Sequence, residues 1–297
     1  MNDADLQSFL TTRKSKIDAL LTENIERLNA PDRLKSAMLY SVQAGGKRIR
    51  PILLLAVMEA FGRDSAPGLQ PACAIEMIHT YSLIHDDLPA MDDDDLRRGK
   101  PTNHKMFDEA TAILAGDALL TYGFEIIAEA AEATVTDRMK TDLVAGLAKA
   151  AGAAGMVGGQ MDDLIAEGQE LSLHDLENIH LHKTGKLLSF SVEAGALLAD
   201  ADPSQRQGLK RFSEHLGLAF QIRDDILDVE GDSAEMGKTA GSDANKQKST
   251  YPRLLTLSGA KQKCGDHLEK AKHYLHGVEI DHGKLEQMAE YIVYRNR

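Results

Sequence analysis

The sequence has few of the residues that mark disulfide-rich or membrane-spanning proteins. Its 297 residues include no tryptophan and two cysteines, Cys73 and Cys264, whose spacing fits neither a disulfide framework nor a zinc site. We therefore expect reduced thiols and a cytoplasmic protein. The longest apolar run, residues 51–58, is far shorter than the roughly 20 residues that span a bilayer, so we expect no membrane insertion. The polar, acidic N-terminus is unlike a secretory signal.

An excess of basic residues is also absent. The net charge is −12 at pH 7, which argues against a nucleic-acid-binding surface. Any basic residues that bind phosphate must therefore be locally clustered. The sequence has no segment rich in proline, glycine and serine that would separate two domains, so we expect one domain over residues 1–297.

Sustained alternation of apolar and polar residues, the pattern of β-strands, is absent, whereas apolar residues recur at helical spacing almost throughout. We expect an all-α protein. Helix starts are expected at proline or capping positions, near residues 31–32, 71, 172 and 203. We expect Gly158 and Gly159 to interrupt a helix, and the polar, glycine-containing segment 230–249 to be a mobile loop that could close over a site.

Two groups of aspartates are the most informative feature that is present. The first group comprises Asp86, Asp87 and Asp92, and the second comprises Asp224, Asp225 and Asp228. On an α-helix, at about 100° per residue, the second group falls on roughly one face, which Gln221 shares. Two aspartate faces held about 6 Å apart repel by roughly 3 kcal/mol per charge pair at an effective dielectric of about 20, and a divalent cation bridging them to a phosphate would reverse this. The pattern predicts a magnesium and diphosphate site, with a solvated acidic loop as the alternative for residues 93–95.

Two clusters of basic residues could hold phosphate. Lys47, Arg48 and Arg50 follow a Gly-Gly turn, where backbone N–H groups and forked arginine donors suit a phosphate. A basic helix cap is the alternative for this cluster. Arg97 and Arg98 directly follow the acidic run, where simple pairing with aspartates is also open.

Other polar residues lie on or between the expected helices. His79 lies two helical turns before the first aspartate group and is either a substrate contact or a core histidine. Lys183 and Thr184 end a helix, where cations are ordinary partners of the helix dipole. Lys238 and Lys248 lie in the polar segment, where solvated lysines are common.

Together these motifs resemble those of the trans-isoprenyl diphosphate synthases, most of all the bacterial members that make farnesyl diphosphate, from roughly residue 30 to residue 295. The matching segments are Gly-Gly-Lys-Arg-Ile-Arg-Pro at 45–51, Ser-Leu-Ile-His-Asp-Asp-Leu-Pro-Ala-Met-Asp at 82–92, Arg-Arg-Gly-Lys-Pro-Thr at 97–102, Gly-Gly-Gln-Met-Asp at 158–162, Lys-Thr-Gly at 183–185, Gln-Ile-Arg-Asp-Asp-Ile-Leu-Asp at 221–228, Gly-Lys at 237–238 and Lys-Ser-Thr-Tyr-Pro at 248–252.

The resemblance implies an isoprenoid-synthase helical bundle around a deep central cavity, usually as a homodimer. It implies a magnesium-dependent reaction in which isopentenyl diphosphate condenses with dimethylallyl or geranyl diphosphate to give (2E,6E)-farnesyl diphosphate and diphosphate. A geranyl or geranylgeranyl diphosphate synthase is the nearest alternative. A class I terpene cyclase would normally have a different second metal motif, and a non-catalytic prenyltransferase subunit should have lost one aspartate group.

The resemblance also implies roles for individual residues. About three Mg²⁺ ions would bind at Asp86, Asp87, Asp92, Asp224, Asp225 and Asp228. The allylic diphosphate would be bound by Arg97, Lys183, Thr184, Gln221 and Lys238, with Lys248 beside it. Isopentenyl diphosphate would be bound by Lys47, Arg50, His79 and Arg98. The catalytic residues would be Asp86, Asp92, Lys183 and Asp224.

The first aspartate group departs from the simple Asp-Asp-x-x-Asp spacing, because two extra residues, including Pro89, separate Asp87 from Asp92. On an ideal helix Asp92 would point about 240° from Asp86. We expect Pro89 to end or distort the helix, so that the chain turns Asp92 back. The C-terminal residues 294–297 have no role that the resemblance assigns.

Product length is predicted from residues one helical turn before the first aspartates. Tyr81 and Ser82 lie where a chain growing away from the metals would meet the cavity wall. Each added isoprene unit could gain about 4 kcal/mol of burial, so a bulky side chain must obstruct it. Tyr81→Ala should shift the product towards twenty carbons or more, and Ser82→Phe should shorten it towards ten, as chromatography of the dephosphorylated products would show. An unchanged fifteen-carbon product in both variants would make Tyr81 an ordinary core aromatic.

Overall fold

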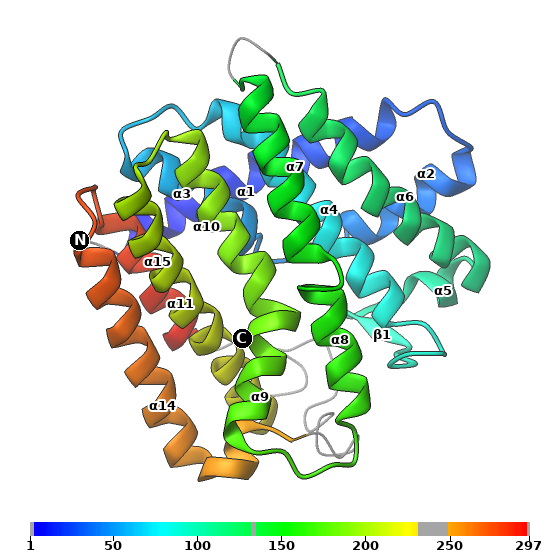
Figure 1. Ribbon diagram of the computed structural model, residues 1–297. Coiled ribbons are helices and arrows are strands. Elements are labelled where there is room, and N and C mark those ends of the chain that lie inside the picture. The colour runs from blue at the N-terminus through cyan, green and yellow to red at the C-terminus, as the bar shows by residue number, and fades with distance from the viewer. Residues whose placement is uncertain (1–2, 132–134, 231–248, 296–297) are drawn as a thin grey trace. The chain divides into compact units, whose positions relative to one another are not determined.

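The computed structural model describes residues 3–131, 135–230 and 249–295, and nearly all of its regular elements are helices (Figure 1). Over these ranges the strands are limited to one antiparallel pair, β1 (Leu96–Arg97) and β2 (Lys100–Pro101). The prediction of an all-α protein is confirmed. The chain divides into two compact units, residues 1–55 with 66–144 and residues 56–65 with 145–297.

The first unit contains the helices that precede and follow the first aspartate group. They are α1 (Asp3–Glu26), α2 (Asp32–Val42), the start of α3 (Ile49–Ala60), the 3-10 turn η1 (Ala66–Gly68), α4 (Leu69–Asp86), α5 (Asn103–Met106), α6 (Glu109–Ala128) and the start of α7 (Asp137–Ala151). Most side chains of α4 are buried, and the helix packs along α6. Gly123 of α6 allows this packing, because a Cβ there would lie 3.3 Å from the carbonyl oxygen of Ala74.

Helix α4 ends at the aspartates because the chain cannot continue as a regular helix through Pro89. Asp86 is the last helical residue and Asp87 is the C-cap. The backbone N–H of Asp92 then donates to the carbonyl oxygen of Asp86 at 2.8 Å. The expected turn of the chain, which returns Asp92 to Asp86, is therefore confirmed.

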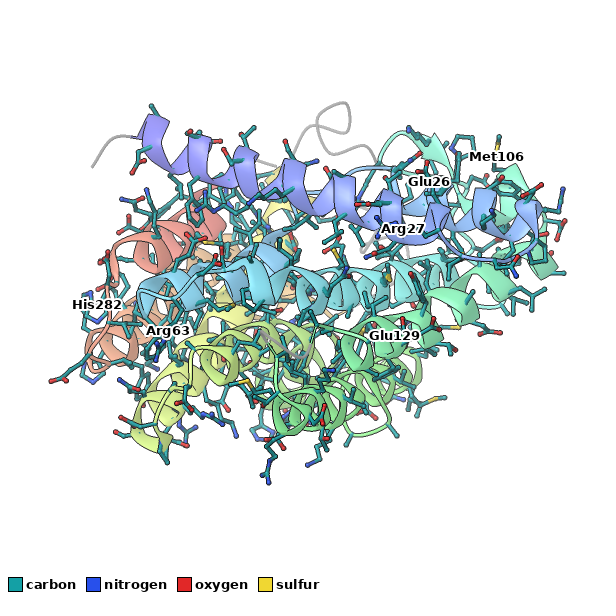
Figure 2. All side chains as sticks on the ribbon, turned by 90° about the horizontal axis from the view of Figure 1, so that it is seen from above. Glu26, Arg27, Arg63, Met106, Glu129 and His282 are labelled. Carbon is teal, nitrogen blue, oxygen red and sulfur yellow. The ribbon has the colours of Figure 1, made fainter. Side chains whose placement is uncertain are left out.

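The surface of the first unit is partly apolar along α6. Figure 2 labels Glu26, the last residue of α1, and Met106, the last residue of α5. The side chain of Met106 is 55% exposed. Among the described residues α6 is the one helix long and apolar enough to cross a membrane, a test that core helices of soluble proteins also pass. One face of α6 packs within the unit, and the other exposes Ile113 and Leu114.

The second unit contains the remaining helices and the ends of α3 and α7. They are α8 (Met156–Ile165), α9 (Leu173–His180), the π-helix η2 (Leu181–Gly185), α10 (Lys186–Leu198), α11 (Pro203–Glu230), α14 (Tyr251–His276) and α15 (Gly283–Tyr294). Helices α11 and α14 lie side by side (Figure 1). Two expected caps are present: the hydroxyl of Ser172 accepts from the N–H of Asp175 at 3.2 Å, and Asp202 accepts from the N–H of Gln205 at 2.9 Å.

The expected helix break at Gly158 and Gly159 is wrong, because both residues lie inside α8. The chain breaks earlier, between the end of α7 at Ala151 and Gly155, the N-cap of α8. Gly159 has a different structural role, since a Cβ there would lie 2.2 Å from the backbone nitrogen of Lys183. The missing side chain lets α8 and η2 approach closely.

Candidate metal and diphosphate sites

The first aspartate group has one carboxylate turned into the protein and two that are partly accessible. Asp87 is buried, and Arg97 holds its carboxylate through Nε at 2.8 and 2.9 Å and through Nη2 at 2.5 Å. A forked contact of this kind fixes both partners. Asp86 and Asp92 are half-buried and joined through their backbones. They are therefore the more accessible carboxylates of this group.

The contact between Arg97 and Asp87 bears on the predicted diphosphate site. Burial raises the pKa of the Asp87 carboxyl, and the bonds to Arg97 offset only part of that effect. The alternative that an arginine after the acidic run pairs with an aspartate is thus correct for Arg97 in this structure. Its remaining nitrogen, Nη1, takes no part in this contact, so a diphosphate could share the guanidinium with Asp87.

A neutral histidine lies beside arginines in the first unit. Burial and the neighbouring guanidiniums, first Arg50 and then Arg98, hold the pKa of His79 well below its ordinary value. Arg98 also donates to the carbonyl oxygen of Gly45. Its guanidinium fits against Gly46, where a Cβ would lie 2.8 Å from it. Three of the residues predicted to bind isopentenyl diphosphate, His79, Arg50 and Arg98, are thus near one another.

The basic side chains of the turn before α3 differ in burial. Arg48 adopts a left-handed backbone conformation with φ 54°, and its buried guanidinium donates to Asp18 at 2.7 Å and to Glu76 at 2.6 Å. Lys47 is exposed and Arg50 is half-buried. Arg48 therefore has a structural role, and the predicted phosphate contacts of this turn are limited to Lys47 and Arg50.

Tyr81 and Ser82 lie on α4 one turn before Asp86. Tyr81 is 6% exposed and packs edge-on against His85, with ring centroids 5.7 Å apart. The hydroxyl of Ser82 donates to the carbonyl oxygen of His79 at 2.9 Å. Burial, and then the charge of Asp86, raise the pKa of Tyr81, so its phenol stays neutral. A neutral buried phenol agrees with both a cavity floor and a core aromatic, so the role in product length stays a prediction.

In the second unit a π-helical turn presents two of the predicted diphosphate ligands. Element η2 carries Lys183 and Thr184, and π-helical turns are rare and often found at functional sites. Lys183 Nζ donates to Asp163 of α8 at 2.6 Å. The hydroxyl of Thr184 donates to Oε1 of Gln221 on α11 at 3.1 Å. This turn therefore connects α8 with α11 through its two polar side chains.

The second aspartate group also contains carboxylates of two kinds. Nε2 of Gln221 donates to Oδ1 of Asp225 at 3.1 Å, so these residues share a face of α11, as predicted. Asp225 and Asp228 are buried. The side chain of Asp224 is 43% exposed and pairs with the guanidinium of Arg295. Asp224 is therefore the more accessible carboxylate of this group.

Two residues at these sites are not identified by the sequence motifs. Arg295 belongs to the C-terminal segment, where its guanidinium lies 4.2 Å from the centroid of the Phe220 ring and its carbonyl oxygen accepts from Nε of Arg223 at 2.9 Å. Asp163 directly follows a matched segment and pairs with Lys183. In the sequence, Arg295 is visible only as a basic residue near the C-terminus, and Asp163 only as an acidic residue beside a motif. Neither feature indicates which residue it pairs with.

Part of the predicted site lies outside the described residues. Lys238 and Lys248 both fall there, as does most of the expected loop at 230–249. The predicted contacts of these lysines and the expected closure of the loop therefore stay expectations.

Both aspartate groups suit a magnesium ion that is only partly enclosed by protein. Within the described ranges no three carboxylates, imidazoles or thiolates are placed to hold a metal by themselves. Magnesium commonly binds through one or two carboxylates and completes its shell with water and phosphate oxygens. The accessible carboxylates of Asp86, Asp92 and Asp224 fit that mode.

Comparisons with known proteins identify relatives of this chain. The polyprenyl synthetase family model matches residues 31–291. The chain is 54% identical to the farnesyl diphosphate synthase of Geobacillus stearothermophilus over 296 residues, which cover 100% of each chain. It is similar to the structure of an FPP/GFPP synthase from Zymomonas mobilis, with 38% identity, a TM-score of 0.86 and coverage of 98% of this chain and 99% of that one. It is also similar to a geranyltransferase from Helicobacter pylori complexed with magnesium and isoprenyl diphosphate, with 33% identity, a TM-score of 0.85 and coverage of 99% and 97%.

The chain therefore belongs to the polyprenyl synthetase family. The predicted resemblance and the predicted enzyme class, a prenyltransferase, are confirmed.

Gly159→Ala tests the close approach of α8 to η2. A Cβ 2.2 Å from the backbone nitrogen of Lys183 must push the two elements apart, and overpacking of this kind costs about 1–3 kcal/mol. We expect a lower midpoint of urea unfolding. We also expect weaker binding of inorganic diphosphate by calorimetry, since Lys183 and Thr184 move with η2.

The matched control is Gly265→Ala in α14, where nothing lies within 4 Å of the added Cβ. There the substitution should stabilise the protein by roughly 0.5–1 kcal/mol, because alanine favours helix. A Gly159→Ala protein as stable as the Gly265→Ala protein would contradict the close approach.

Proposed function

We propose that this protein is a magnesium-dependent prenyltransferase that condenses isopentenyl diphosphate with dimethylallyl or geranyl diphosphate and releases (2E,6E)-farnesyl diphosphate and diphosphate. The observation that carries this proposal is the pair of aspartate groups, each with an accessible carboxylate and a nearby cation. The identity of 54% to a farnesyl diphosphate synthase over the length of both chains supports it. The geranyltransferase structure, which holds magnesium and isoprenyl diphosphate, supports the cofactor and the substrate class.

The aspartates are proposed to hold about three Mg²⁺ ions together with the allylic diphosphate. When bound, these ions neutralise negative charge on the leaving diphosphate. The burial of Asp87 and its contact with Arg97 fit a supporting role. The proposed ligands are Asp86, Asp92 and Asp224, supported by Asp87, Asp225 and Asp228.

The reaction starts when the allylic carbon–oxygen bond breaks and its electron pair leaves with the diphosphate. Fixed cations and hydrogen-bond donors stabilise that charge as it develops. The double bond of isopentenyl diphosphate then attacks the allylic cation, and the released diphosphate accepts the proton that is lost as the new trans double bond forms. Holding both substrates in place makes this a step within one complex. The proposed contacts of the allylic diphosphate are Arg97, Lys183, Thr184, Gln221, Lys238 and Lys248.

The diphosphate of isopentenyl diphosphate is proposed to bind at the basic group of the first unit. Lys47, Arg50 and Arg98 supply positive charge. His79, which its surroundings keep neutral, can donate one hydrogen bond without adding a further charge. Arg48 is not part of this site, because its guanidinium is held inside the protein.

A product assay tests the proposed function. The purified protein with isopentenyl diphosphate, geranyl diphosphate and Mg²⁺ should give a fifteen-carbon diphosphate, identified by chromatography after dephosphorylation. A twenty-carbon or ten-carbon main product from the same substrates or from dimethylallyl diphosphate would favour the geranylgeranyl or geranyl alternative. Conversion of geranyl diphosphate without consumption of isopentenyl diphosphate would indicate a cyclase and contradict the proposal.

Asp86→Ala and Asp224→Ala should each lower turnover by orders of magnitude, because each removes a carboxylate proposed to hold magnesium. The far-UV helical signal should stay nearly unchanged. Asp95→Ala is the matched control, since Asp95 belongs to the acidic run but is 75% exposed and pairs with Lys105 at 2.8 Å. Near-normal turnover in either of the first two variants would remove the metal assignment.

Arg50→Ala should separate the two diphosphate sites. Losing a charge-assisted contact is worth about 1.5–3 kcal/mol, so the KM for isopentenyl diphosphate should rise roughly ten- to hundredfold. The KM for geranyl diphosphate should change little. Lys183→Ala should show the opposite pattern in the same steady-state assay. If Arg50→Ala weakens only the allylic substrate, the division of the two sites is wrong.

A homodimer is proposed from an exposed groove on the first unit. The groove is lined by residues of α2 and α6 that include Leu34, Leu114 and Ala118, and Leu114 is 58% exposed. Exposed apolar patches mark interaction sites, and soluble homo-oligomers commonly pair identical patches of two copies. In sedimentation velocity Leu114→Glu should convert dimers to monomers, whereas Ile165→Glu, at an apolar residue 62% exposed outside the groove, should not. A monomeric wild-type protein would contradict this proposal.

The domain organisation and the cellular location are proposed from the comparisons. The family model runs across both compact units, which supports one polyprenyl synthase domain over residues 1–297. The match to a bacterial enzyme over its full length supports a cytoplasmic location.

A further inference from the structure

Asp224 and Asp225 are neighbours in sequence, but their carboxylates have different surroundings. The side chain of Asp224 is 43% exposed, whereas Asp225 is 4% exposed. Oδ1 of Asp225 accepts from Nε2 of Gln221 at 3.1 Å, and Oδ2 accepts from the backbone N–H of Tyr251 at 3.0 Å. Both carboxylate oxygens of Asp225 are therefore engaged with the protein.

Asp225 lies in the middle of a hydrogen-bond chain that joins three elements. The chain starts at η2, where the hydroxyl of Thr184 donates to Oε1 of Gln221 at 3.1 Å. The amide of Gln221 then donates to Asp225, which also accepts from the first residue of α14. An ionised carboxylate only accepts hydrogen bonds, so it can satisfy a donor on each side. The side chain of Asp225 thus links the position of η2 to that of α14.

The bond to Tyr251 caps α14 from a different helix. Thr250 is the N-cap of α14, and its side chain makes no capping hydrogen bond. The first N–H groups of a helix have no partner within the helix, and a negative charge there also suits the helix dipole. Asp225 supplies an acceptor and a charge to the first turn of α14, which a non-helical backbone at Thr256 (φ 67°) separates from the rest of the element. It therefore fixes the start of α14 at Tyr251.

We propose that Asp225 is a positioning residue and not a ligand of magnesium. This inference rests on the proposed function, because it divides the work of that site between two adjacent carboxylates. Asp224 binds the metal. Asp225 holds Thr184, through Gln221, and the start of α14. It thereby sets the position of Thr184 and Gln221, which are proposed to bind the allylic diphosphate.

The isosteric variant Asp225→Asn separates the two roles. The asparagine can rebuild the chain: its oxygen accepts from Tyr251, and its NH₂ group donates to Gln221 once that amide turns over and donates to Thr184 instead. An aspartate that binds a metal ion cannot be replaced by asparagine in this way, because the neutral amide lacks the negative charge that attracts the ion. The comparison variant is Asp224→Asn.

The first measurement is the affinity for Mn²⁺. The electron paramagnetic resonance signal of the free ion reports how much Mn²⁺ is unbound. Asp86→Ala serves as the background, so that the first aspartate group contributes little. Asp225→Asn should weaken binding by less than about fivefold, the effect of removing a nearby charge through a screening medium. Asp224→Asn should weaken binding by about tenfold or more, because it removes the charge of a ligand. Circular dichroism checks that both variants are folded.

The second measurement is hydrogen exchange at the backbone N–H of Tyr251. Asp225→Ala should speed this exchange about tenfold or more, because the N–H loses a charged acceptor. Asp224→Ala should leave it unchanged. Gln221→Met cuts the chain on the other side, so it should raise the KM for geranyl diphosphate while the exchange at Tyr251 and the affinity for Mn²⁺ stay as in the wild type.

Two results would overturn the division of roles. One is an equal loss of Mn²⁺ affinity in the two asparagine variants, and the other is unchanged exchange at Tyr251 in Asp225→Ala. Neither of these two results needs turnover. If the binding and exchange results are as expected but no prenyl product forms, the proposed function fails and the hydrogen-bond chain stands. If farnesyl diphosphate forms but the losses are equal, only the division of roles fails.

Discussion

A carboxylate that leaves water must be met by donors or cations of the protein, and this requirement shapes both aspartate groups. Asp87 is met by a forked guanidinium, and Asp225 by an amide and a backbone N–H. The more accessible carboxylates, Asp86, Asp92 and Asp224, are the ones that a metal ion and a diphosphate can reach. Each group therefore combines carboxylates that hold the protein together with carboxylates that suit a ligand.

Features that act over a few residues are readily predicted from the sequence. The helical period of the apolar residues predicts the all-α fold, Pro89 predicts the end of α4 and the return of Asp92, and Ser172 predicts the start of α9. The expected break at Gly158 and Gly159 is wrong because it treats glycine only as a helix breaker. A glycine inside a helix costs about 1 kcal/mol relative to alanine, which is small beside the overlap that a Cβ would cause at η2.

Contacts between distant parts of the chain could not be predicted in the same way. Asp224 and Arg295 are separated by 71 residues, and Asp225 bonds to a backbone N–H 26 residues away. The motifs specify which residue types are present, but helix packing and side-chain rotamers decide which cation meets which carboxylate. Arg97 shows this, because its position beside the acidic run allowed either a phosphate contact or an aspartate contact.

The turn between α2 and α3 also restricts the length of the chain at that point. Its left-handed residue, Arg48, sends one guanidinium inward to Glu76, while Lys47 and Arg50 stay out of that interior contact. Counted from α2, adding one residue before Lys47 would bring Lys47 to the place of Arg48, and deleting one would bring the apolar Ile49 there. Glu76 would then be buried without its partner at the same moment that the basic group lost its arrangement. A change in loop length there cannot damage binding and spare folding, so the spacing of this turn is as restricted as its composition.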